Sequence, residues 1–152
     1  METLVRHLGR IFTLKTKDGQ RLPSPRTLRK MDALERTLSA WLENKGWRIP
    51  VRTAVETAER LGTDTGTLHR YFQERVGMDF RTWRTRLRLE DAMRMLAENP
   101  RMQAAEAGRR AGFSNRSNFA RQFRAYTGLT PAQWQKKARM SPDIQASKND
   151  YV

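Results

Sequence analysis

The sequence predicts an all-α protein built from two similar helical units joined by a long helix. Three observations support this fold class. Apolar residues recur at helical spacing in seven segments between residues 31 and 139, and none of these segments favours a sheet. Glycine or proline ends most of the segments. One half of the chain also repeats the other, which indicates a duplicated unit.

The first unit is predicted for residues 31–78 and contains three helices. The first helix is expected to start near residue 31, because the stretch "PSPR" at 23–26 interrupts helical periodicity and is typical of a linker. The second helix ends at Gly62, and the third follows Asp64 as its N-cap and ends at Gly77. The side chains expected to face the core are Leu34, Leu38, Trp41 and Leu42, then Val51, Val55, Ala58 and Leu61, then Leu68, Phe72 and Val76.

A linker helix is predicted for residues 79–98, and the second unit follows at 99–139. Pro100 ends the linker helix, because the residue before a proline disfavours helical geometry. In the second unit Ser114 or Asn115 is expected to cap the longer helix, and Thr130 to cap the last one. The expected core side chains are Phe80, Trp83, Leu87, Ala92 and Leu96 in the linker, and Phe113, Phe119, Phe123 and Trp134 in the second unit.

The duplication rests on residues that recur at constant spacing. Gly62 pairs with Gly112 at an offset of 50 positions. Five further residues recur 51 positions later: Leu68, Arg70, Phe72, Gly77 and Trp83 match Phe119, Arg121, Phe123, Gly128 and Trp134. Each unit is thus a short helix, a turn with glycine and a longer helix. This is the plan of a helix-turn-helix, whose second helix can enter the major groove of DNA.

The chain is strongly basic, and its charge is uneven. The net charge is +14, the isoelectric point is about 11.3 and there is no cysteine. Residues 1–30 carry eight Lys or Arg and two acids, and residues 101–139 carry nine and one. This balance favours a polyanionic partner, nucleic acid before an anionic membrane. We treat residues 1–30 as a basic arm, which contains a possible short hairpin at Asp18-Gly19, and residues 140–152 as a flexible tail.

The helix predicted near residues 115–126 combines aromatic anchors with cations. Phe119 and Phe123 lie on one face, and Ser117, Arg121 and Arg124 lie on the other. An amphipathic helix with a solvated basic face is the simplest alternative. The duplication and the charge of the segment favour a helix that reads DNA.

These residues resemble the AraC/XylS family of bacterial transcription regulators over about residues 31–139. The most specific matches are Gly112-Phe113, Ser114, Ser117, Phe119, Arg121, Phe123, Gly128, Thr130-Pro131 and Trp134, with Arg88-Leu89, Ala92 and Leu96 in the linker. The resemblance implies an all-helical domain that activates or represses promoters by reading two successive major-groove segments of double-stranded DNA, with helices near 65–76 and 115–126. The base-reading positions it implies are Thr65, Gly66, His69 and Arg70, then Arg116, Ser117, Asn118 and Arg121. Phosphate contacts are expected from Ser114, Asn115 and Arg124.

Three features depart from the pattern of the family. Ala107 and Gly108 stand where a branched apolar residue and alanine are usual, so we expect loose packing in the second unit, since glycine inside a helix costs roughly 0.5–1 kcal/mol. Gly66 stands where a longer side chain would reach a base, which puts reading by the first unit in doubt. Thirty N-terminal residues are too few for the ligand-sensing domain of many members, so no small-molecule sensor is expected.

Other kinds of chemistry find little support. His69 is far in sequence from His7, the only other histidine, and no catalytic or metal-ligating set of residues stands out. We therefore expect a non-enzyme without cofactor or metal, acting as a cytoplasmic, nucleoid-associated monomer with no membrane contact. RNA polymerase or a regulatory protein is a further partner to consider.

The arginines at 81, 84, 86 and 88 favour a solvated helix face over a DNA-binding stripe, and Arg88 is a candidate for a structural role. Two alternatives stay open: a protein–protein adaptor and a non-specific nucleic-acid binder.

Overall fold

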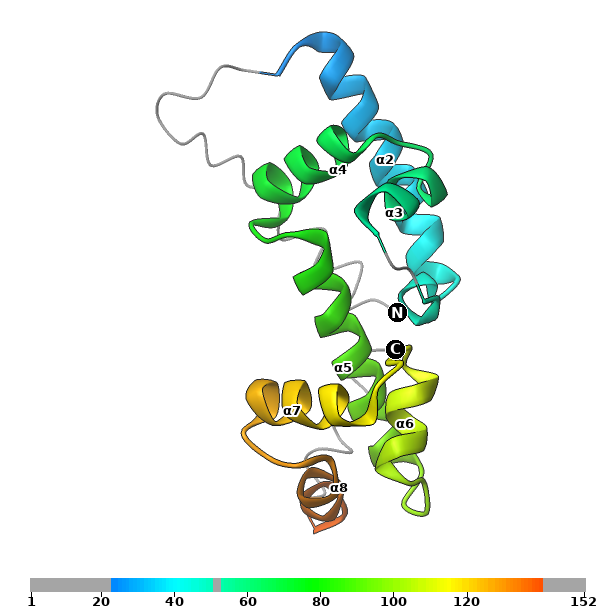
Figure 1. Cartoon of the computed structure of the whole chain (residues 1–152), viewed down its shortest axis with the longest axis vertical. Coiled ribbons are helices and arrows are strands. Elements are labelled where there is room, and N and C mark those ends of the chain that lie inside the picture. Colours follow the sequence, from blue (N-terminus) through cyan, green and yellow to red (C-terminus); the bar gives the residue numbers. More distant parts are fainter. Residues whose placement is uncertain (1–22, 51–52, 141–152) are drawn as a thin grey trace. The chain divides into compact units, whose positions relative to one another are not determined.

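The computed structural model describes residues 23–50 and 53–140 and is all-helical there. The α-helices follow one another along the chain as α2 to α8 (Figure 1). Their bounds are α2 Pro25–Glu43, α3 Ala54–Arg60, α4 Thr65–Tyr71, α5 Phe80–Glu98, α6 Ala104–Arg110, α7 Arg116–Thr127 and α8 Pro131–Met140. Two short helices join them: the 3₁₀ helix η1 Gly46–Arg48 and the π-helix η2 Phe72–Val76, which extends α4. The predicted all-α class and its seven α-helices are confirmed within this described part. The possible hairpin at Asp18-Gly19 and the tail beyond residue 140 lie outside it.

The first helix starts earlier than predicted. The sequence suggested a linker at residues 23–26, but α2 begins at Pro25. The side chain of Ser24 accepts a hydrogen bond from the backbone N–H of Thr27, and proline suits the first helical position because its missing N–H has no partner there. The expected linker is therefore a helix start, and part of the predicted basic arm belongs to α2.

The chain divides into two compact units, and the division interrupts the sequence. Among the described residues, the first unit comprises 23–46 and 53–83, and the second comprises 47–50 and 84–140. The linker helix α5 thus contributes its first turn to one unit and its remainder to the other. This differs from the sequence-based prediction, in which residues 79–98 form an element separate from both units.

The first unit is built around one face of α2 and an aromatic cluster. Met31, Leu34, Leu38 and Leu42 are all buried on α2. The rings of Trp41, Phe72, Phe80 and Trp83 stack or meet at an angle, with centroids 5.1–5.9 Å apart. Val55 was expected in this core but is 56% exposed. It lies in the first turn of α3, and the residues of α3 that pack inward are Thr57 and Ala58, one turn later.

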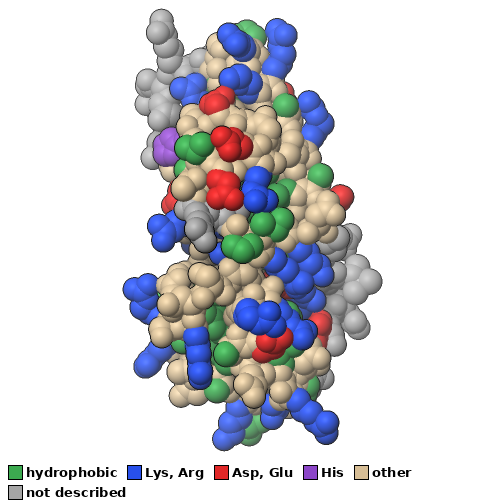
Figure 2. Space-filling model, turned by 45° about the vertical axis from the view of Figure 1, so that its right-hand side comes forward, with side chains coloured by type: hydrophobic (Ala, Val, Ile, Leu, Met, Phe, Trp, Pro, Cys, Tyr) green, Lys and Arg blue, Asp and Glu red, His purple; other side chains and the backbone are tan. Residues whose placement is uncertain are grey.

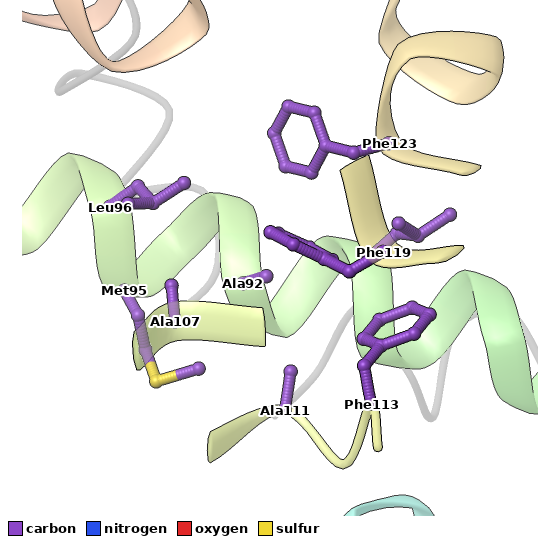
Figure 3. Close-up of a cluster of buried hydrophobic side chains, with 9 residues drawn as sticks. Ala92, Met95, Leu96, Ala107, Ala111, Phe113, Phe119 and Phe123 are labelled. Carbon is purple, nitrogen blue, oxygen red and sulfur yellow. The ribbon is translucent and has the colours of Figure 1, made fainter. Parts of the chain in front are cut away.

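The second unit has its own core between α5, α6 and α7 (Figure 3). Phe119 and Phe123 extend from α7 to the linker helix, where they meet Ala92 and Leu96, and Phe113 fills the turn before α7. A Cβ built on Gly108 would come within 2.6 Å of Cδ1 of Phe119. The expected loose packing at this position is therefore wrong, because the missing side chain of Gly108 is the space that the ring of Phe119 occupies.

A short segment of chain between α2 and α3 completes the second unit. Trp47 is buried and donates its indole N–H to Asp91 at 3.1 Å, and Arg48 donates two hydrogen bonds to the same carboxylate at 2.6 and 2.9 Å. Arg94 adds a third side chain at 2.6 Å. Arg88 donates to the backbone carbonyls of Trp47 and Ile49, which confirms its expected structural role.

The two units repeat each other in their helix ends as well as in sequence. Asp64 caps α4 and Asn115 caps α7, and each side chain accepts from the backbone N–H three residues later. Gly77 ends η2 and Gly128 ends α7, at left-handed φ values of 76° and 77°. The duplication predicted from residue spacing is thus present in the backbone. No helix in the described part of the chain is long and apolar enough to span a membrane.

Candidate nucleic-acid interface

The second helix predicted to read DNA, α7, is anchored on one face and exposes cations on the other. Phe119 and Phe123 are buried to 2% and 0% exposure, and they fix how the helix is rotated on the core. The predicted base-reading residues Arg116, Ser117 and Arg121 are all exposed, as the spacing of the anchors requires. The core thus holds one face of α7 and leaves the opposite face to solvent.

Asn118 differs from the other predicted reading residues of α7. It is half-buried, and its side-chain oxygen accepts hydrogen bonds from Arg121 Nη2 at 3.0 Å and from Gln122 Nε2 at 2.8 Å. Its carbonyl oxygen therefore orients the guanidinium of Arg121. The structure brings these two predicted residues together, and Arg121 is the one that extends into solvent.

The predicted phosphate-contacting residues surround this face. Asn115 uses its side-chain oxygen to accept from the backbone N–H of Asn118, so its amide N–H groups are left to donate to a ligand. Ser114 is exposed beside it. Arg124 and Arg121 line a shallow groove together with Ala120, Ala125 and Thr130. Two cations beside small side chains form a surface to which an anionic group could approach closely.

The first helix predicted to read DNA, α4 continued by η2, presents a different surface. Thr65, Gly66, His69 and Arg70 are exposed, as predicted. Arg70 lies 3.7 Å from the carboxylate of Glu74 on the next turn. Gly66 adds no side chain. Of the four predicted reading positions, only Thr65 and His69 therefore offer a polar side chain that has no acidic partner within the described part of the chain.

The N-cap of α4 adds a negative charge to the first unit. Asp64 accepts from Thr67 N–H and Thr67 Oγ1 at 2.8 and 2.9 Å, and forms an ion pair with Lys30 at 2.8 Å. The bond from Lys30, followed by the bonds from Thr67, holds the pKa of this carboxyl well below its usual value. The corresponding cap of α7 is the neutral Asn115.

α4 with η2 and α7 consequently differ in charge. α7 contains three arginines, Arg116, Arg121 and Arg124, and no acid, and none of these arginines forms an ion pair among the described residues. Figure 2 shows Lys and Arg side chains spread over the visible face, with Asp and Glu among them. Both helices present exposed side chains to solvent. Of the two, only α7 also carries positive charge that no acid neutralises.

Sequence reasoning missed one group of exposed cations. Arg26, Arg29 and Lys30 were assigned to the arm, but they lie on the first two turns of α2. The signal that could have revealed them is the pair Ser24-Pro25, an N-cap followed by a proline at the first helical position. Among the described residues, no cluster of three or more His, Cys, Asp or Glu could hold a metal ion.

Comparison with known proteins agrees with this architecture. A family model described as a helix-turn-helix domain matches residues 57–137, more than half of the chain. A solved structure, described as a transcriptional regulator of the AraC-type DNA-binding domain-containing proteins from Chromobacterium violaceum, superposes with a TM-score of 0.60 at 19% identity. The match covers 73% of this chain and 96% of that one. The structural likeness supports the fold.

Two curated relatives extend the comparison by sequence. The arabinose operon regulatory protein of Escherichia coli (strain K12) is 25% identical over 122 residues, which cover 70% of this chain and 40% of that protein. The uncharacterized transcriptional regulatory protein YesN of Bacillus subtilis (strain 168) is 34% identical over 71 residues, which cover 46% of this chain and 19% of that protein. The chain thus spans less than half the length of these relatives. The family match, the duplicated helix-turn-helix and the residues that carry it lead to one conclusion: the chain belongs to the AraC/XylS family of transcription regulators.

Proposed function

We propose that this chain binds double-stranded DNA in a sequence-specific manner, with α7 as its principal reading helix. The observation that carries the proposal is the outward face of α7, where exposed arginines stand on a helix held by Phe119 and Phe123. Arginine can bond two acceptors on the major-groove edge of guanine, and a helix fits this groove. The bond from Arg121 to Asn118 supports a reading role, because it orients the guanidinium before DNA arrives.

The proposal assigns base contacts to Arg116, Ser117 and Arg121, with Asn118 orienting Arg121. Ser114, Asn115 and Arg124 would contact phosphates at the border of the groove. Phosphate contacts supply affinity and set the register of the protein, whereas base contacts supply specificity. The net positive charge of the chain would add to affinity for any duplex.

The first unit is proposed to read the neighbouring major-groove segment more weakly, through Thr65, His69 and Arg70. Gly66 and the ion pair between Arg70 and Glu74 support this difference. The target would then consist of two unlike blocks, one strongly and one weakly specified. Control of promoters, action as a monomer, a cytoplasmic and nucleoid-associated location, and contact with RNA polymerase or a regulatory protein belong to the same proposal. This role requires no catalysis.

The proposal is tested by selecting, from a pool of random duplexes, those that the protein binds. Binding to the selected site is then measured in competition with random DNA at about 0.15 M salt. We expect the selected site to bind roughly 10³-fold or more tightly than random duplex. A preference below about tenfold would support a non-specific binder, and no binding to duplex DNA would support a protein–protein adaptor. Footprinting on the selected site then shows whether both units contribute, since two protected blocks are expected, and the block contacted by α7 should tolerate fewer base changes.

A further inference from the structure

The amino-terminal turns of α2 carry a cluster of exposed cations that no assigned role explains. We define the α2 basic patch as Arg26, Arg29 and Lys30. All three side chains are exposed, and together with Ala33 they surround a shallow depression. Spacings of three and four residues place them on one side of the helix.

This patch is not neutralised by the acids of its own helix. The nearest acids on α2 are Asp32 and Glu35, and both form ion pairs with Arg75, at 3.3 and 3.1 Å. Arg26 and Arg29 form no ion pair with any residue in the described part of the chain. Two guanidinium groups on adjacent turns thus remain available for an anion.

One contact places the patch beside the first reading helix. Lys30 Nζ lies 2.8 Å from Asp64, the residue that caps α4 and immediately precedes the reading positions Thr65 and Gly66. Lys30 also neutralises Asp64, which would otherwise repel an approaching phosphate. The patch therefore borders the surface that α4 presents to a duplex.

We propose that Arg26 and Arg29 bind the sugar-phosphate backbone of double-stranded DNA at the edge of the groove that α4 faces, with Lys30 as the link to α4. This inference rests on the proposed function and adds to it a role for the first unit. The reading face of α4 offers little free positive charge, because Arg70 is paired with Glu74. The α2 basic patch supplies the missing cations, so the first unit contributes chiefly affinity and register, and α7 contributes most of the base reading.

The salt dependence of binding tests the inference on the full chain, with the selected duplex as probe. The logarithm of the binding constant falls with the logarithm of salt concentration by about 0.9 for each phosphate contact. The double variant R26Q/R29Q removes both charges and is expected to flatten this slope by about 1.8. The variant R26K/R29K keeps both charges and should retain a slope close to that of the wild type.

A matched control separates a local contact from a loss of overall charge. The double variant K45Q/R60Q also removes two exposed cations of the first unit, at the other end of α2 and on α3. It should change the slope by less than about 0.9, the change expected for the loss of one phosphate contact. Ethylation interference gives an independent measurement: phosphates at one flank of the site that are essential for the wild type should cease to matter for R26Q/R29Q. Circular dichroism melts of each variant verify that the fold is retained.

The outcomes distinguish this inference from the proposed function. If the wild type binds the selected site but R26Q/R29Q keeps the wild-type slope, or loses no more than K45Q/R60Q, the inference is overturned and the proposed function stands. If the wild type shows no preference for any duplex, the proposed function fails and the inference fails with it.

Discussion

Gly108 of α6 and Phe119 of α7 are in such close contact that a methyl group on Gly108 would lie 2.6 Å from Cδ1 and 2.7 Å from Cγ of the phenyl ring. Glycine is a poor residue for a helix interior, yet here it sets how closely the two helices of the second unit approach. The ring cannot easily move away, because Phe119 also packs against Phe113 and Phe123, with centroids 5.1 and 5.5 Å from its own.

The first prediction is that Gly108→Ala destabilises the second unit. Helix propensity alone would stabilise the variant by up to about 1 kcal/mol, whereas forcing a methyl group into a filled core costs typically about 1–3 kcal/mol. We expect a net loss, measured by chemical denaturation of the full chain. Gly66→Ala is the control, since its new methyl group would meet only Asp64 Oδ1, at 3.3 Å. A Gly108→Ala variant more stable than the wild type would show that the ring of Phe119 moves freely.

A second prediction concerns Phe123, which is fully buried and meets the rings of Phe119 and Trp134. Phe123→Ala should unfold the second unit, because removing a buried phenyl ring costs about 3–5 kcal/mol. Circular dichroism should show a loss of helix at ambient temperature or a much lower melting point. Tyr126→Phe, on the same helix but 43% exposed, should lose about 1 kcal/mol or less with its hydrogen bond to Glu90. An undiminished cooperative melt of Phe123→Ala would contradict a core role.

A third prediction concerns Asp91 and pH. Burial by itself raises the pKa of Asp91, but the hydrogen bonds from Arg48, Trp47 and Arg94 outweigh burial and hold the pKa below its ordinary value. A carboxyl with a lowered folded-state pKa stabilises the protein above its unfolded pKa, about 3.9, and this contribution is lost as pH falls through the folded value. Asp91→Asn should therefore be less stable than the wild type at pH 7, by on the order of 1–3 kcal/mol, since it leaves the partly exposed Arg48 and Arg94 without their carboxylate partner.

The pH series provides its own control for Asp91. The difference in unfolding free energy between the wild type and Asp91→Asn should be constant from pH 7 down to about pH 5 and should narrow below about pH 4. The other carboxyls with lowered pKa values, those of Asp64, Asp79 and Glu106, are present in both proteins, so their effects cancel in the difference. A difference that does not change with pH would mean that the charge of Asp91 does not stabilise the second unit.

A fourth prediction concerns Arg121. If its guanidinium reads a guanine edge, Arg121→Ala should weaken binding to the selected site by about 1–3 kcal/mol and relax the preference at one base position. Binding to random duplex should change much less. Arg109→Ala is the matched control, because Arg109 is an exposed arginine of the same unit that is paired with Glu106. Equal losses on selected and random DNA would make Arg121 a phosphate contact.

The helices and the duplication could be predicted from local patterns. Each of these signals acts only on the few residues next to it, so it can be recognised without knowledge of the fold. They are the periodic apolar residues, the N-cap Asp64 and the terminating glycines Gly77 and Gly128. The early start of α2 at Pro25 was missed for a different reason. The same Ser-Pro pair is compatible with a linker or with a helix start, and local reading had favoured the linker.

By itself the sequence determined that this protein is all-helical, duplicated and strongly basic, with Arg121 on the face opposite Phe119 and Phe123. Only the tertiary structure decided that Gly108 is a contact surface for Phe119, that Trp47 and Arg48 bind Asp91 more than forty residues away, and that Lys30 reaches Asp64 at the start of α4. The sequence alone specifies which face of a helix is apolar, because the direction of each side chain follows from the roughly 3.6 residues in every helical turn. Which residues meet across helices depends on close packing and on pairing of buried charges, and these are properties of the assembled core.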